Sequence, residues 1–176
     1  YDVVISGAAS GYGILTGSSL PTASATNRVT VSSGIVSVSK STDARTGKVA
    51  QGGKDIKLAK FDVKAFGEDF ELRSFYYVVQ NVTTALAGTL KVQDSAGTIL
   101  YSVAGSSAQY KASTPSGSTL GDWAKITLSN YKTIKAGTTE TLTFVVDVSS
   151  SAVNTDTYQV YVTEFYGKRL STKDYY

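Results

Sequence analysis

Apolar and polar residues alternate along most of the chain after residue 28, and a period of two is that of a β-strand. The alternation is clearest at 139–148, where Leu142, Phe144, Val146 and Val148 fall on one face. We find no convincing stretch with the three- and four-residue spacing of an amphipathic helix. Turn-forming Gly, Ser, Asn and Asp residues separate the alternating segments. The pattern predicts strands at 2–6, 29–38, 56–65, 70–79, 89–93, 98–103, 123–128, 139–148 and 158–162.

These roughly eight or nine strands predict an all-β fold, an antiparallel β-sandwich of the Ig-like or jelly-roll kind. The strand expected at 56–65 begins with apolar residues at even positions and continues with apolar residues at odd positions, and the strand at 70–79 does the same. A slip of one residue is the mark of a β-bulge. We therefore expect both strands to bend, or to pass from one sheet to the other at a corner of the sandwich.

Composition changes along the chain and predicts three regions. Residues 1–27 are rich in Gly, Ala, Ser and Thr, and we expect an N-terminal arm with one short strand. That arm is either an ordinary terminal strand with a long loop or a segment that pairs with a neighbouring subunit. Residues 28–165 form the sandwich domain. Residues 166–176 are polar and aromatic, and we expect a C-terminal tail that is a candidate second arm.

The chain lacks the residues on which most catalysis depends. It contains no Cys, no His and no Met, whereas Ser and Thr number 23 and 22. His is the usual acid–base group near neutral pH, and His and Cys are the commonest ligands of zinc. The carboxylates Glu68, Asp69 and Glu71 are close in sequence and could flank a cleft, but a Gly-Glu-Asp turn at 67–69 is usually solvated. We predict that the protein is not an enzyme and has no cofactor and no metal site, although Asp94, Asp122, Asp147 and Asp156 stand at turns or strand ends where a calcium ion remains an alternative.

Charge and hydropathy limit the partners and the compartment. The net charge of +3 comes without a basic stripe, so we expect no nucleic acid partner. We also expect no membrane insertion, because no apolar run approaches the ~20 residues that span a bilayer. The charged fraction is 18%, below the ~25% usual for soluble domains, and Ser, Thr, Gly and Tyr take its place. We expect an extracellular or cell-surface location, with the chain that opens at Tyr1 being a processed form or a piece of a longer one.

Three kinds of residue are candidates for modification or contact. Asn81 begins an Asn-Val-Thr sequon and is a candidate glycosylation site, with an unmodified Asn as the alternative. Trp123 follows a Ser- and Gly-rich stretch and either stacks on a ligand or caps the core. Tyr is abundant at 12 residues, and several fall on the face opposite the apolar one or in the tail. Those tyrosines are expected either at an interface or on a second buried face.

Three segments within residues 29–165 carry a resemblance to known proteins. They are VAQGGKDIKLAKFDVKAFGEDFELRSF at 49–75, LKVQDSAGTIL at 90–100 and IKAGTTETLTFVVDVSSSA at 134–152. The chain resembles the Ig-like repeat modules of large secreted surface proteins of bacteria, of the kind predicted in ultrasmall candidate-phyla lineages. It is also loosely similar to the jelly-roll subunits of TasA-like biofilm fibres. The resemblance implies a sandwich outside the cell, and the fibre subunits imply assembly by donating a terminal strand to the next subunit.

Two hypotheses for the function follow. The first is a structural subunit of an extracellular filament or surface layer, whose partners are copies of itself. Val3, Val4 and Ile5 would then form the donor strand that pairs with an open sheet edge of the next molecule. The second is a carbohydrate- or protein-binding adhesive module of a larger surface protein, with surface glycans as partners and Trp123 beside the loop 105–121 as the site.

Overall fold

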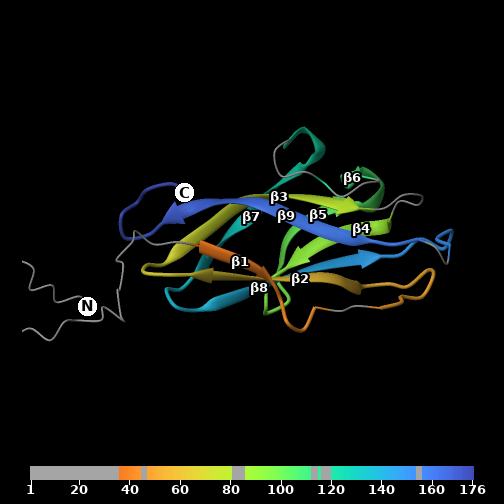
Figure 1. The fold of residues 1–176 in the computed structure, drawn as a ribbon, viewed down its shortest axis with the longest axis horizontal. Helices are drawn as coiled ribbons and strands as arrows, with labels where there is room; N and C mark the ends of the chain where they lie inside the picture. The colour runs from red at the N-terminus through yellow and green to blue at the C-terminus, as the bar shows by residue number, and fades with distance from the viewer. Residues whose placement is uncertain (1–35, 45–46, 81–85, 112–114, 116–119, 154–155) are drawn as a thin grey trace, which may run out of the picture. The chain divides into compact units, whose positions relative to one another are not determined.

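The computed structural model of the 176-residue chain describes residues 36–44, 47–80, 86–111, 115, 120–153 and 156–176 (Figure 1). All of them belong to one compact unit, residues 34–176. This unit is an all-β sandwich in which two sheets pack face to face, as the alternation predicts. Among the described residues, no helix has the length and apolar character to cross a membrane.

The first sheet has five strands in the order β1-β2-β8-β4-β5, and every neighbouring pair is antiparallel. In the second sheet β3 is central, with β9 antiparallel on one side and β7 antiparallel on the other; a short parallel bridge joins β3 to β6. The strands are β1 (Val36–Lys40), β2 (Ile56–Ala65), β3 (Phe70–Gln80), β4 (Ala87–Gln93), β5 (Ile99–Ala104), β6 (Tyr110–Lys111), β7 (Ala124–Ile134), β8 (Thr139–Asp147) and β9 (Gln159–Arg169).

The bulges expected in β2 and β3 are confirmed. The register of β2 against β8 slips between Lys57 and Ala59, and the register of β3 against both neighbours slips between Leu72 and Ser74. Because one extra residue is inserted, Leu72 and Phe75 both face the interior although their positions differ in parity, and both are fully buried. The odd–even switch in the sequence therefore marks a bulge, and neither strand passes from one sheet to the other.

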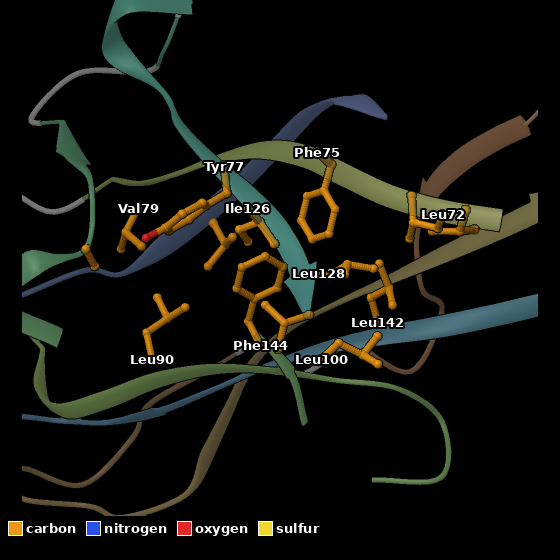
Figure 2. Close-up of a cluster of buried hydrophobic side chains, with 14 of the residues drawn as sticks. Leu72, Phe75, Tyr77, Val79, Leu90, Leu100, Ile126, Leu128, Leu142 and Phe144 are labelled. Atoms are coloured by element: carbon orange, nitrogen blue, oxygen red, sulfur yellow. The ribbon is translucent and has the colours of Figure 1, made fainter. Parts of the chain in front are cut away.

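The core lies between the two sheets and is built mainly from β3, β7 and β8 (Figure 2). Phe75 is its centre: its ring meets Phe144 of the opposite sheet edge-on at 6.3 Å and stacks on Phe165 at 4.8 Å. Each fully buried side chain of this size stabilises the fold by about 1.5–3 kcal/mol relative to exposure. The chain contains no Cys, so packing of this kind takes the place of disulfides.

One long side of the sandwich is closed by contacts between the sheets. Ser129 of β7 donates a hydrogen bond to the Leu100 carbonyl of β5 at 3.3 Å. Lys132 of β7 reaches Asp94, in the turn between β4 and β5, at 2.8 Å. The β5–β7 side is thus tied by polar groups in addition to packing.

The segments outside the predicted strands differ in part from expectation. The stretch expected as a loop at 105–121 contains a 3₁₀ turn at Gly105–Ser107 and the strand β6, which pairs with the end of β3. The expected tail at 166–176 is not a free arm, because β9 runs through Arg169 and the final residues fold back on it. The backbones of Gly167 and Tyr176 exchange two hydrogen bonds of 3.0 Å. The expected N-terminal arm and its strand at 2–6 lie outside the described residues.

Candidate functional site

A groove of about 540 Å³ opens between β2 and β9, on the side of the sandwich opposite the β5–β7 contacts. We call it the β2–β9 groove. Its apolar lining comes from Leu58 and Phe61 of β2 and from Val160 and Val162 of β9. Three of these four side chains are only partly buried, whereas Val160 is buried. The groove is therefore a strip of incompletely covered core between the two sheets.

The β2 wall of the groove is open because β1 is short. Lys40, the last residue of β1, lies opposite Phe61, and the chain then turns at Ser41. The Ser41 hydroxyl donates to Asp43 at 2.7 Å, and its backbone N–H donates to the Lys60 carbonyl at 3.0 Å. Within the described part of the chain, the first half of β2 consequently pairs with β8 alone.

The β9 wall is open for a related reason. β9 pairs with β3 along its whole length, and in the described part of the chain the C-terminal end folds back on the other edge of β9 at 167–169. Among the described residues, no strand pairs with the edge of β9 at Val160–Val162. Two strand edges therefore face one apolar groove, and unpaired edges are the natural place for an added strand.

The groove continues toward the end of the sandwich. A second hollow of about 490 Å³ shares Val49, Leu58 and Tyr158 with the first and extends past Val148 and Ala152. The two hollows form one seam along the sandwich. A strand of several residues, with alternate side chains directed inward, has the shape that such a seam admits.

The rim of the groove is basic. Lys40, Lys57 and Lys60 line it, and no acidic side chain stands among its described lining residues. Lys60 is paired with Asp43, and the hydrogen bond from this lysine holds the pKa of Asp43 below its ordinary value. Lys40 and Lys57 are exposed. An occupant with an acidic residue beside an apolar run would complement both the lining and the rim.

The carboxylates near the β2–β3 turn act as structural acceptors. Glu68 accepts hydrogen bonds from Ser171, and Asp69 accepts them from Lys135 and the Ala136 backbone. Glu71 binds Arg73 at 2.7 Å. Each of the three carboxylates is thus engaged by a different segment of the chain, as expected of structural acceptors.

The four aspartates at turns and strand ends are likewise separate. Asp94 binds Lys132, Asp122 binds Lys111, and Asp147 accepts the Asp55 backbone N–H at 2.9 Å. Asp156 accepts the backbone N–H of Val153 at 2.8 Å. Across the described ranges, no three His, Cys, Asp or Glu side chains gather in a way that would hold a metal ion.

The remaining predicted site residues fall in different places. Trp123 lies just before β7 and is only 9% exposed, so its ring presents little surface for stacking on a sugar. It directly precedes Ala124, which lies opposite Tyr77 of β3, and it is not a member of the main core cluster. Asn81 and the expected donor residues Val3, Val4 and Ile5 lie outside the described residues.

A set of tyrosines and cations on the outer face of the second sheet, which is turned away from the core, was only partly indicated by the sequence. The Arg73 guanidinium lies over the rings of Tyr131 and Tyr175, at 4.4 Å and 5.2 Å from their centroids. Alternation identifies Tyr76 and Tyr166 as outward-facing. It does not pair Arg73 with Tyr131, because alternation within a strand does not give the register between two strands; these residues lie next to the pair Leu72 and Lys132 of β3 and β7.

The open groove and the outer tyrosine face are features of the described residues that packing of the core does not explain. Comparison with protein-family models, with curated proteins and with solved structures finds no match to the chain.

Proposed function

We propose that the protein is a structural subunit of an extracellular filament or surface layer, whose copies associate by strand donation. The observation that carries the proposal is the β2–β9 groove, where two strand edges face one apolar seam. A strand laid into this seam gains main-chain hydrogen bonds from the edges and buries alternate side chains against Leu58, Phe61 and Val162. No catalytic role is needed to account for the groove.

The donor in this proposal is the segment 2–6, with the sequence DVVIS. Its apolar run Val3, Val4 and Ile5 is flanked by Asp2, and Asp2 is the one acidic residue in the first 35 positions. A lysine-lined edge repels unsuitable strands, because exposed cations discourage edge-to-edge pairing. The same lysines attract a strand that carries a carboxylate at its end, so Asp2 favours this segment over the apolar residues near Arg28.

The position of β1 is compatible with a chain of subunits. Val36, the first described residue, lies opposite Ala65, at the end of β2 away from the groove. Ala65 and Leu58 are seven residues apart, or about 23 Å along the strand at ~3.3 Å per residue. An arm that leaves at one end of the sandwich and fills the groove at the other end of the next copy makes a heterologous contact, and contacts of this type propagate into fibres.

Removal of the arm is the direct experiment. A chain lacking residues 1–27 is compared with the full chain by negative-stain imaging and by sedimentation of assembled material. We expect the shortened chain to remain folded and monomeric, and a peptide of residues 1–8 added in trans to shorten the fibres of the full chain. Fibres of normal length from the shortened chain would exclude strand donation by the arm.

A further inference from the structure

The pairing of β3, β7 and β9 is irregular at neighbouring positions in the middle of the second sheet. At each irregularity a side chain points away from the core, on the outer face of the sheet. The bulge in β3 between Leu72 and Ser74 carries Arg73. The matching stretch of β7, between Thr127 and Lys132, carries Tyr131. In β9 the register slips beside Glu164, whose φ of +50° is rare for a residue with a side chain, and Tyr166 follows. Bulges commonly re-aim side chains at functional sites.

Arg73 and the tyrosines around it form a cluster of side chains in mutual contact. Arg73 is held by two hydrogen bonds of 2.7 Å and 2.9 Å to the same oxygen of Glu71, while Tyr131 and Tyr175 contact its planar group. These bonds raise the pKa of Arg73, although burial opposes them. Because the arginine is fixed, both tyrosine rings are held in place before any ligand arrives.

A second cluster lies next to the first on the same face. The rings of Tyr76 and Tyr166 meet edge-on at 6.2 Å, and the Lys125 ammonium stands 5.6 Å from one ring and 6.0 Å from the other. The Lys168 ammonium lies 5.8 Å from Tyr175. Within the described residues, neither lysine has a carboxylate in ion-pair contact. We call the whole surface the tyrosine–cation face: Arg73, Tyr76, Lys125, Tyr131, Tyr166 and Tyr175, with Lys168 at its edge.

The chemistry of the face favours a sugar polymer over a protein or a nucleic acid. Protein interfaces have an apolar centre, but Val78, the aliphatic residue of β3 on this face, is fully buried. Nucleic acids need many cations, whereas Glu71 already neutralises Arg73 here. What is exposed is tyrosine, at 51% of the residue for Tyr131, 38% for Tyr166 and 70% for Tyr175, beside the ammonium groups of Lys125 and Lys168. The carboxylate near these rings, that of Glu164, accepts a hydrogen bond from the Tyr166 hydroxyl at 3.0 Å.

We propose that the tyrosine–cation face binds an anionic polysaccharide made of uronic acid units. Sugar rings stack on Tyr166 and Tyr175, and the carboxylates of the polymer pair with Lys125 and Lys168. Tyr166 and Lys168 are two residues apart on β9, about 7 Å by the rise of a strand, so neighbouring units of one polymer engage both. The face is independent of the β2–β9 groove, so a subunit whose copies assemble through the groove keeps it for binding the polymer.

Binding is tested with the full chain and polygalacturonate, by affinity electrophoresis and titration calorimetry, with uncharged dextran as the comparison polymer. We expect binding of polygalacturonate and not of dextran, and weaker binding at higher salt. Tyr166→Ala with Tyr175→Ala should weaken binding roughly fivefold or more, since each exposed cation–π or stacking contact contributes severalfold. Lys125→Gln with Lys168→Gln should weaken it and flatten its salt dependence.

The matched control lies on the outer face of the first sheet, where Lys64 stands 4.9 Å over the ring of Phe66. Lys64→Gln with Phe66→Ala removes one cation and one exposed ring of similar accessibility and should leave binding unchanged. Equal loss in both variant pairs would mean nonspecific attraction to a basic protein and would overturn the proposal. The proposal also fails if polygalacturonate does not bind, if single-stranded DNA binds more tightly, or if the tyrosine variants lose self-assembly instead of polymer binding.

Discussion

The Lys132 ammonium lies 2.8 Å from Oδ2 of Asp94 and joins β7 of the second sheet to the β4–β5 turn of the first. The other carboxylate oxygen of Asp94 accepts the backbone N–H groups of Ala96 and Thr98, at 3.0 Å and 2.8 Å. Lys132 also reaches Glu140 at 3.3 Å. One aspartate therefore shapes a turn and holds the closed side of the sandwich.

Replacing this aspartate is expected to be costly. Its side chain is only 6% exposed, so Asp94→Ala leaves two turn N–H groups without their acceptor and leaves the half-buried Lys132 ammonium with Glu140 alone. We predict a loss of about 2–4 kcal/mol in the free energy of unfolding, measured by urea denaturation. Asp43→Ala, which breaks the exposed pair with Lys60, is the control and should have no comparable effect. Equal destabilisation by the two changes would contradict the account of the closed side.

Stability should be flat near neutral pH and fall at both extremes. Burial acts to raise the pKa of Asp94, but the bonds from Lys132 and Thr98 prevail and hold it below its ordinary value of 3.8. The backbone N–H of Asp55 lowers the pKa of Asp147 in the same way. A lowered native pKa adds stability above the unfolded pKa, and this stability is lost as the pH falls below about 4 through the native value.

At alkaline pH, stability is expected to fall as the pH rises. Burial raises the pKa of Tyr77, and likewise of Tyr101, above the ordinary value of 10.0. The stability that goes with a raised native pKa is present below pH 10.0 and lost as the pH rises through the native value. With no His in the chain, urea midpoints should change little from about pH 5 to pH 9. A steep change between pH 6 and pH 8 would contradict this reading.

Gly167, the one glycine of β9, leaves no room for a side chain. A β-carbon there would stand 2.3 Å from both the Glu71 carbonyl oxygen and the Phe70 ring. Gly167→Ala must therefore push β9 away from β3, where Tyr176 also packs edge-on against Phe70 at 6.4 Å. We predict a loss of about 1–3 kcal/mol in thermal or urea unfolding.

The matched control for this prediction is Gly121→Ala. An added β-carbon at Gly121 meets nothing within 4 Å, so the change should stay within about 0.5 kcal/mol. If both alanine variants unfold at the same urea concentration as the unchanged chain, the close approach of β9 to Phe70 is not a structural constraint.

The sequence predicts the parts of the fold that depend on local period. Alternation at Leu142, Phe144 and Val146 identifies β8, and the odd–even switches of β2 and β3 identify their bulges. The order of strands depends instead on pairing between distant segments. The pattern alone therefore gives neither the contact between β3 and β6 nor the early end of β1 that opens the groove.

The sites were predictable to a smaller degree. Lys57 and Lys60 look like the solvated side of a strand, and only the approach of β9 turns them into a groove rim. Arg73 and Tyr131 meet because the register of β3 against β7 places them next to the pair Leu72 and Lys132, and alternation within a strand does not give that register. Val145 has the parity of an outward position but is buried, since Lys57 and Lys91 flank it on the neighbouring strands. The aliphatic parts of lysine side chains on neighbouring strands can bury an outward apolar residue, and the sequence of that residue's own strand does not show this.

Exchanging the charges of Asp2 and of the rim lysines tests where the proposed donor strand lies in the groove. Asp2→Lys places a cation against Lys40 and Lys57 and should raise the critical concentration for assembly about fivefold, as exposed ion pairs contribute up to ~1 kcal/mol. Lys40→Glu with Lys57→Glu, combined with Asp2→Lys, should restore assembly in sedimentation assays. Failure of the combined variant to recover, while the Lys variants alone remain folded, would place the donor elsewhere.

The most direct measurement of strand donation uses the absence of Cys, which makes introduced thiols unique. One chain carries Ile5→Cys, a second carries Gln159→Cys on the groove lining, and the two are mixed under assembly conditions with a short bismaleimide. The account predicts a cross-linked dimer between the two chains, and none when Gln159→Cys is replaced by Ile99→Cys on the exposed edge of β5. Equal cross-linking to both positions, or cross-links found only within one chain when both cysteines are on it, would contradict donation between subunits.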